Sequence, residues 1–290
     1  MRHIFHPTDF SPPSDVAFVH ALRLALACVG SLTLFHYARG EEQEDDPHGF
    51  PGVRDTLARW GLLPPNSPRE AVASALGLHV RKVEVGGDDP TDAILGYIGR
   101  HPADLIVLAT HQRGGAARWL EREVALPVAR QSRIPALFVP PDAAGFVDAA
   151  SGEVRLHRIL LPVDRRPHPR TAIELVPALV EVLAAAPAAV ELLHVGTLAT
   201  IPRVQLPESG GLTWTTRLME GAVVEEILEA EVERAADLLV LATEGRRGFL
   251  DALRGSTTEQ IVRRARCPVL AVPGGAGARS DSEVAHAEDV

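Results

Sequence analysis

Several features are scarce in this sequence, and each scarcity excludes a class of protein. Only two cysteines occur, Cys28 and Cys267, so a disulfide scaffold is excluded and a reducing compartment is expected. Aromatic residues make up 4% of the chain, too few for a surface that stacks nucleobases. The net charge of −9 would repel a phosphate backbone, and no apolar run is long enough to cross a bilayer. We therefore expect a cytoplasmic protein with no nucleic-acid and no membrane partner.

Motifs for hydrolysis and for metal binding are also missing. Neither the nucleophile elbow Gly-x-Ser-x-Gly nor the phosphate-binding loop Gly-x-x-x-x-Gly-Lys-Ser/Thr occurs. The 12 histidines are scattered, with no Cys-x-x-Cys and no helical His-x-x-x-His beside a carboxylate. We interpret His36 and His194 as packing residues, and leave open that His6 and His111 face one crevice as a functional or metal-binding pair. No catalytic residue and no metal ligand is predicted.

The chain does contain an internal repeat. The segment Asp-Leu-Ile-Val-Leu-Ala-Thr at 104–110 returns as Asp-Leu-Leu-Val-Leu-Ala-Thr at 237–243, and Ile-Pro-Ala-Leu-Phe-Val-Pro at 134–140 returns as Cys-Pro-Val-Leu-Ala-Val-Pro at 267–273. A repeat of this length can bury its own core, so it indicates a duplicated domain. We expect one domain at 1–141, a linker at 142–153, a second domain at 154–273 and a disordered tail at 274–290.

In each half, short apolar runs alternate with helical patterns, which is typical of βαβ units around a parallel sheet. In the first half the pattern predicts strands near 3–7, 31–37, 79–85, 104–109 and 135–139, and helices near 12–28, 53–74, 90–100 and 121–132. In the second half it predicts strands near 158–163, 189–195, 212–219, 237–242 and 268–272, and helices near 169–185, 222–235 and 256–265. The link at 196–211 is too short and too rich in proline and glycine for a counterpart of the 53–74 helix.

These elements predict a doubly wound α/β fold in each half, with strand order 3-2-1-4-5. Ligands in such folds bind outside the carboxyl ends of the strands, where the winding reverses. That crevice would lie between the first and fourth strands of a half. The residues at those ends are Asp9 and segment 109–112 in the first half, and Asp164 and segment 242–245 in the second.

One segment of the second half has the composition of an anion site. Gly245 follows the fourth strand, and Gly255-Ser256 opens the last helix, whose free N–H groups would suit a phosphate. Arg246, Arg247 and Arg254 add positive charge nearby. The alternative is purely structural, because Ser256-Thr257-Thr258-Glu259 is also a capping box that satisfies the helix start by itself.

Several motifs taken in order carry a family resemblance. The chain resembles a tandem universal stress protein on four signals: Pro-Thr-Asp-Phe-Ser at 7–11, Leu-Leu-His-Val at 192–195, Ala-Asp-Leu-Ile-Val at 103–107, and Gly-Ser followed by Cys-Pro-Val-Leu-Ala-Val at 267–272. The resemblance implies two adenine-nucleotide α-hydrolase-like or flavodoxin-like domains packed as an intramolecular pseudo-dimer. Their last strands, at 136–139 and 269–272, would then cover each other's edge.

The resemblance also implies an ATP site in the second half. Members that bind ATP carry a glycine, two residues, a glycine, nine residues and Gly-Ser or Gly-Thr; here Ala242 replaces the first glycine, and Gly245 and Gly255 fit. By resemblance, Asp164 and Val195 would border the adenine and ribose, next to Pro162 and Val163. The ribose and phosphates would be wrapped by Ala242, Gly245, Gly255, Ser256 and Thr257.

The first half departs from this motif. Gln112 stands in place of the second glycine, and Arg122-Glu123 in place of Gly-Ser. A carboxylate at that helix start would repel phosphates in a poorly screened cleft. We therefore expect the first half to have lost nucleotide binding.

Three functions are compatible with these motifs. The first is an ATP-binding stress sensor or regulatory module, with or without Mg²⁺, that has an unknown protein partner and can form a homodimer. The second is an interaction protein whose two sites are both inactive. The third is a slow ATPase or small-metabolite enzyme, for which Asp164 and Glu244 are the only nearby carboxylates.

Overall fold

The computed structural model describes residues 1–38, 49–110, 124–141, 145–208, 210–244 and 256–274. The first half contains β1 (His3–Thr8), α1 (Pro12–Ala27), β2 (Ser31–Ala38), α2 (Val53–Arg59), α3 (Ala71–Leu76), β3 (His79–Gly86), α4 (Pro90–Arg100), β4 (Leu105–Ala109), α5 (Ala125–Ser132) and β5 (Ala136–Val139). The second contains β6 (Arg158–Pro162), α6 (Arg170–Val182), β7 (Ala188–Val195), β8 (Leu212–Met219), α7 (Val223–Arg234), β9 (Leu238–Thr243), α8 (Thr257–Arg264) and β10 (Val269–Pro273).

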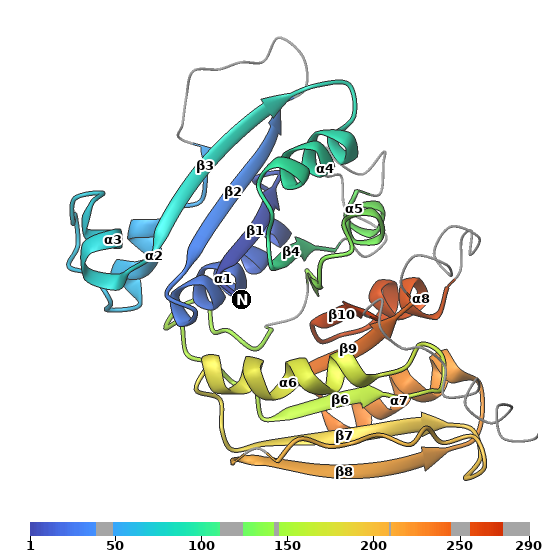
Figure 1. Cartoon of the computed structure of the whole chain (residues 1–290). Helices are drawn as coiled ribbons and strands as arrows, with labels where there is room; N and C mark the ends of the chain where they lie inside the picture. The colour runs from blue at the N-terminus through green and yellow to red at the C-terminus, as the bar shows by residue number, and fades with distance from the viewer. Residues whose placement is uncertain (39–48, 111–123, 142–144, 209, 245–255, 275–290) are drawn as a thin grey trace, which may run out of the picture.

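All the described strands form one sheet of ten strands, in the order β3-β2-β1-β4-β5-β10-β9-β6-β7-β8 (Figure 1). Each half therefore has the predicted order 3-2-1-4-5, and all pairings within a half are parallel. The doubly wound α/β fold is confirmed. The strand bounds agree with the sequence prediction to within about a residue, because central parallel strands read as apolar runs bounded by turns.

The two halves meet through an antiparallel pairing of β5 with β10. Val269 pairs with Phe138, Leu270 with Leu137 and Ala271 with Ala136. This pairing removes the free edge that each sheet would otherwise expose. The predicted intramolecular pseudo-dimer is therefore confirmed, with the two copies side by side in one continuous sheet (Figure 1).

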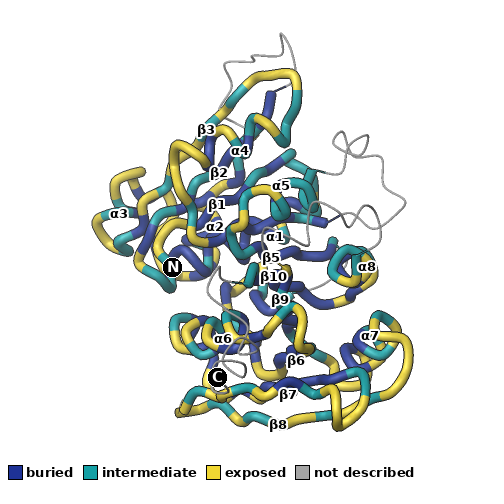
Figure 2. Tube along the Cα trace, turned by 45° about the vertical axis from the view of Figure 1, so that its right-hand side comes forward, coloured by how far each residue is buried: buried dark blue, intermediate teal, exposed yellow. Residues whose placement is uncertain are grey.

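Two apolar layers cover the faces of this sheet and run through both halves. Because side chains alternate along a strand, Ile4 faces the layer that contains α1 and α6, and Phe5 faces the layer that contains α4, α5, α7 and α8. At the junction, Leu137 and Leu270 belong to the first layer, while Phe138 and Val269 belong to the second. Figure 2 shows the buried backbone concentrated in the central strands.

The helix predicted over 53–74 is wrong in extent. The structure has two short helices there, α2 and α3, separated by a segment that contains Pro64, Pro65 and Pro68. Proline lacks the N–H that an interior helical position needs, so the helix is interrupted although the apolar spacing continues. In the second half, residues 196–208 and 210–211 contain no helix, as expected from the sequence.

A buried histidine fastens the segment between the halves to α1. The Nδ1–H group of His20 donates to the carbonyl oxygen of Val16 at 2.8 Å. Its Nε2 atom accepts the backbone N–H groups of Phe146 at 3.1 Å and Val147 at 3.3 Å. The side chains of Phe146 and Val147 are buried, so this part of the expected linker packs against the first half. Burial lowers the pKa of His20 to about 4.

None of the helices in the described ranges is both long enough and apolar enough to span a bilayer.

We predict that the free energy of unfolding falls as the pH drops from about 6.5 to about 4. His20 and His6 both have a pKa lowered by burial to about 4, so only the unfolded chain is protonated in this window. Stability is therefore fully present above pH 6.5, and each group removes up to about 3 kcal/mol by pH 4. In His20→Leu, two backbone N–H groups lose their acceptor, so stability at pH 7.5 should fall by roughly 2–4 kcal/mol and the pH dependence should flatten.

Urea denaturation at several pH values tests this prediction. His157→Gln is the control, because His157 is exposed and should leave the curve unchanged. An unaltered pH dependence in His20→Leu would contradict the assignment of the slope to this residue.

Candidate functional site

The candidate site of the second half lies at the carboxyl ends of β6, β7 and β9. Strand β6 pairs with β9 on one side and β7 on the other, so the winding of the sheet reverses between β6 and β9. Helices attached to neighbouring strands leave the sheet on opposite faces here, which opens a crevice at the strand ends. Three of the predicted site positions, Pro162, Val195 and Ala242, belong to these strands and are partly buried.

A carboxylate follows shortly after the end of β6. Val163 is buried and both of its backbone groups are bonded: its N–H donates to Leu193 at 2.8 Å, and its carbonyl oxygen accepts Nδ1–H of His194 at 2.9 Å. Asp164 follows and is exposed. Its Oδ1 atom accepts the backbone N–H of Arg165 at 2.6 Å. The backbone is therefore fixed up to the point where the carboxylate emerges.

The end of β7 is organised by the buried side chain of His194. Its Nε2 atom lies 2.9 Å from the hydroxyl of Thr200, and that hydroxyl also accepts the backbone N–H of Thr197 at 3.0 Å. A Cβ atom at Gly196 would lie 2.8 Å from both Nε2 of His194 and Oγ1 of Thr200. Only glycine leaves room for this hydrogen-bonded loop beside the site. The interpretation of His194 as a structural residue is consistent with these bonds.

A hollow of about 540 Å³ is lined by Arg165, the residue that follows Asp164. The guanidinium group of Arg165 donates to the carbonyl oxygen of Ala199 and so joins the two loops that form its walls. Leu198 in the wall is 77% exposed, so the hollow offers an accessible apolar side chain. The hollow offers apolar and cationic groups together: Arg165, His168, Leu198, Ala199, Ile201, Pro202 and Arg203.

The last helix, α8, begins at the same edge. Ser256 is its N-cap, and the Ser256 hydroxyl accepts the backbone N–H of Glu259 at 3.2 Å. The Glu259 carboxylate accepts from Arg263 at 2.8 Å. Among the described residues, no group accepts the backbone N–H of Thr257 or Thr258. These two N–H groups lie at the positive end of the helix dipole, where an anion is favoured.

A groove of about 530 Å³ connects this edge with the first half. Because β5 and β10 are antiparallel, the segment before β5 lies beside the carboxyl ends of β9 and β10. Cations of the first half therefore line the same groove as polar groups of the second. The groove is lined by Arg130, Arg133 and Ile134 from the first half, and by Thr243, Glu244 and Thr258 from the second.

The equivalent edge of the first half is filled by aromatic side chains. Phe10 stacks on His36 with 4.0 Å between ring centroids, and its ring meets Phe50 edge-on at 5.3 Å. The Oδ1 atom of Asp9 accepts both the N–H of Ser11 at 3.1 Å and its hydroxyl at 2.5 Å. Nδ1–H of His36 donates to the carbonyl oxygen of Thr8 at 2.9 Å, which matches the bond of His194. Both halves therefore have this histidine bond, but aromatic rings lie beside it in the first half and the Thr200 loop lies beside it in the second.

The possibility that His6 faces the crevice, which the sequence left open, does not agree with its burial. His6 is fully buried and does not face the crevice: its Nδ1–H donates to the carbonyl oxygen of Val107 at 2.9 Å, and its ring lies under Ser14 of α1. It shares the face of Ile4, which packs against α1. The described residues contain no group of three potential metal ligands.

Several predicted positions cannot be placed. Gly245 and Gly255 lie outside the described residues, as do Arg246, Arg247, Arg254, His111, Gln112, Arg122 and Glu123. Four residues that shape the edge were not predicted: Arg165, Gly196, Thr200 and Arg133. A Gly-x-x-x-Thr pattern directly after a strand was a signal for the 196–200 loop. No local signal could reveal Arg133, because its contact with the second half depends on how the two halves pair.

Comparison with known proteins gives the family. The sequence model of the universal stress protein family matches residues 1–140 and 201–273. The chain belongs to the universal stress protein family. A universal stress protein of Methanocaldococcus jannaschii is 37% identical over 68 residues, which is 23% of this chain and 40% of that relative's length.

Solved structures of universal stress proteins share the fold. One from Archaeoglobus fulgidus has a TM-score of 0.61 at 16% identity and covers 94% of this chain and 98% of its own. One from Pseudomonas aeruginosa has a TM-score of 0.59 at 14% identity and covers 93% of this chain and 91% of its own. Both alignments extend over almost the whole chain, so the likeness in fold includes both halves.

We predict that Gly196→Ala destabilises the second half. The added Cβ would meet the His194 ring and the Thr200 hydroxyl, so their hydrogen bond must break or the loop must shift. The free energy of unfolding should fall by about 1–3 kcal/mol, measured by urea denaturation. The matched control is Gly210→Ala in the same link, where nothing lies within 4 Å of the added atom. Equal effects of the two changes would contradict a packing role for Gly196.

Proposed function

We propose that the second half binds an adenine nucleotide, ATP in the first instance, and that the chain acts as a nucleotide-responsive sensor or regulatory module in stress. One observation carries the proposal. The carboxyl edge of the second half carries an exposed carboxylate, a hollow that includes Arg165, and N–H groups at the start of α8 that no described residue accepts. At the same edge of the first half, Phe10 packs against His36 and Phe50.

The adenosine part would lie beside β6 and β7. Asp164 would accept from the ribose hydroxyls, since ionised carboxylates are strong acceptors for hydroxyl donors. Pro162, Val163 and Val195 would border the ring from the strand ends. Leu198 in the neighbouring hollow would lose its unfavourable exposure against a flat apolar base.

The phosphates would lie at the start of α8. The N–H groups of Thr257 and Thr258 and the helix dipole favour an anion there. Ala242, Gly245, Gly255 and Ser256 would allow close backbone approach to the phosphates, because their side chains are small or absent. Glu244 lines the adjoining groove, so Mg²⁺ bound with the nucleotide would offset its repulsion of the phosphates.

The groove between the halves supports a signalling role. Arg133 of the first half and Thr258 of the second line the same groove. A phosphate held by α8 and by Arg133 would contact both halves at once. Binding energy that depends on the relative position of two parts can shift an equilibrium between their arrangements. The protein partner that reads such a shift is unknown.

An interaction protein with both sites inactive is the alternative of another class. The capping bond of Ser256 to Glu259 supports it, because the helix start is then partly satisfied without a ligand. A slow ATPase or a small-metabolite enzyme has less support, since Asp164 and Glu244 are the carboxylates available to hold Mg²⁺ at this edge. Mg²⁺-dependent release of phosphate from ATP would favour the enzyme.

We predict that the purified full chain binds one ATP. Gly255→Trp should abolish binding, because a large side chain would fill the space beside the start of α8. The matched control is Arg122→Trp, the equivalent position of the first half at an offset of 133 residues, which should keep one nucleotide per chain. Isothermal titration calorimetry gives the stoichiometry, and mass analysis of nucleotide released by denaturation identifies the ligand.

The opposite pattern, with ATP lost in Arg122→Trp and kept in Gly255→Trp, would place the site in the first half and overturn the proposal. No binding to either variant or to the parent chain would favour the interaction protein.

A further inference from the structure

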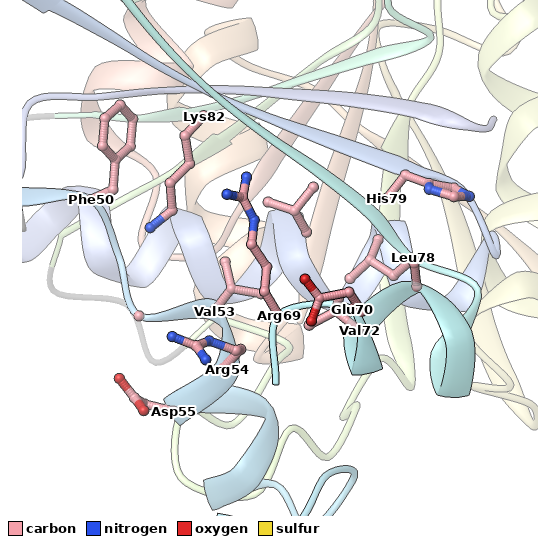
Figure 3. A pocket seen from close by; sticks show the side chains of 13 residues that line it. Phe50, Val53, Arg54, Asp55, Arg69, Glu70, Val72, Leu78, His79 and Lys82 are labelled. Atoms are coloured by element: carbon pink, nitrogen blue, oxygen red, sulfur yellow. The ribbon is translucent and has the colours of Figure 1, made fainter. Parts of the chain in front are cut away.

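The first half has a cleft beside its edge strand. It has a volume of about 750 Å³ and lies between the α2–α3 segment and the edge strand β3 (Figure 3). The corresponding link of the second half contains no helix in the part that the structure describes, so the duplication supplies no equivalent wall there. The volume is in the range typical of pockets for small molecules. We refer to it as the basic cleft.

Three cations from three separate segments line the basic cleft. They are Arg54 in α2, Arg69 just before α3 and Lys82 in β3. Figure 3 shows Arg69 and Lys82 reaching into the same space, with Arg54 below them. Burial, followed by the charges of Arg69 and Arg54, lowers the pKa of Lys82, while the smaller effect of Asp55 opposes this shift. Both arginines are therefore close enough to Lys82 to repel its charge.

No carboxylate of the described ranges neutralises these cations directly. Asp55 and Glu70 also line the cleft, yet none of the three cations forms an ion pair with any residue that the structure describes. Arg54 donates to the carbonyl oxygen of Ser67 at 3.0 Å, which holds its position without cancelling its charge. A concentration of positive charge on a chain with a net charge of −9 is a local feature that composition does not explain.

The floor of the cleft is apolar. Leu78 is fully buried, and Val53 and Val72 are nearly so. The Nζ atom of Lys82 lies 5.5 Å from the ring centroid of Phe50, a favourable arrangement that places this cation over an apolar wall. A ligand that complements these surfaces has an anionic group and an apolar part.

We infer that the basic cleft binds a small phosphorylated molecule with an apolar part. Planar guanidinium groups match the oxygens of a phosphate, and the ammonium of Lys82 supplies a point charge from the opposite wall. A phosphate accepts from all three directions at once, whereas a carboxylate offers two oxygens in one plane. The site is separate from the proposed nucleotide site and does not depend on it.

The test measures binding of inorganic pyrophosphate, as the probe, to the full chain by isothermal titration calorimetry at low ionic strength. Lys82→Gln and Arg69→Gln should each weaken binding by at least about tenfold, because each removes a charge-assisted hydrogen bond. The matched control is Arg81→Gln, the neighbour of Lys82 on β3, which does not line the cleft. Pyrophosphate affinity should be unchanged in it. Thermal unfolding confirms that the variants remain folded.

Two further measurements distinguish the basic cleft from the nucleotide site and a phosphate ligand from a carboxylate. Gly255→Trp should retain pyrophosphate binding, and loss of binding in that variant would overturn the inference. Succinate should bind more weakly than pyrophosphate; the reverse order would overturn the phosphate assignment. The inference also fails if the parent chain does not bind pyrophosphate, or if Arg81→Gln weakens binding as much as Lys82→Gln.

Discussion

The pairing of β5 with β10 is the constraint on which the rest of the structure depends. It turns two five-stranded sheets into one and joins both apolar layers across the junction, with Leu137 and Leu270 on one face and Phe138 and Val269 on the other. Because the pairing is antiparallel, it also brings the end of α5 to the carboxyl edge of the second half. The position of Arg133 in the groove beside Thr258 follows from that geometry and from nothing local in either half.

Within this common frame the two copies have diverged at equivalent places. Both keep the bond from the second-strand histidine to the end of the first strand, as His36 to Thr8 and His194 to Val163. Aromatic rings cover that bond in the first half, and a loop held by Thr200 adjoins it in the second. The first half in turn has the α2–α3 segment and its basic cleft. Duplication has thus preserved the strands that form the core, while the segments that follow these strands differ between the halves.

The strands of the sheet could be predicted from the sequence, whereas the contacts at the carboxyl ends of the strands could not. Strands buried on both faces read as apolar runs, so their bounds could be predicted from the sequence. The β5–β10 contact was expected only from the resemblance to tandem universal stress proteins. The prediction of one helix at 53–74 was wrong because the apolar pattern continues through a segment in which Pro64 and Pro65 interrupt the helix. The position of His6 was left open, and strand alternation puts it on the buried face of Ile4. The contacts of Gly196 with His194 and of Arg133 with the second half arise only from tertiary packing. No periodic pattern in the sequence indicates them.

The central claim is that nucleotide binding is confined to the second copy. Photocrosslinking of the full chain with an azido-ATP, followed by peptide mapping, tests it most directly because it reports position without any substitution. Labelled peptides are expected from 154–273, near Asp164, Val195 or the start of α8, and unlabelled ATP should compete with the label. Label that ATP displaces from the region of Phe10 and His36, or equally from both halves, would contradict it.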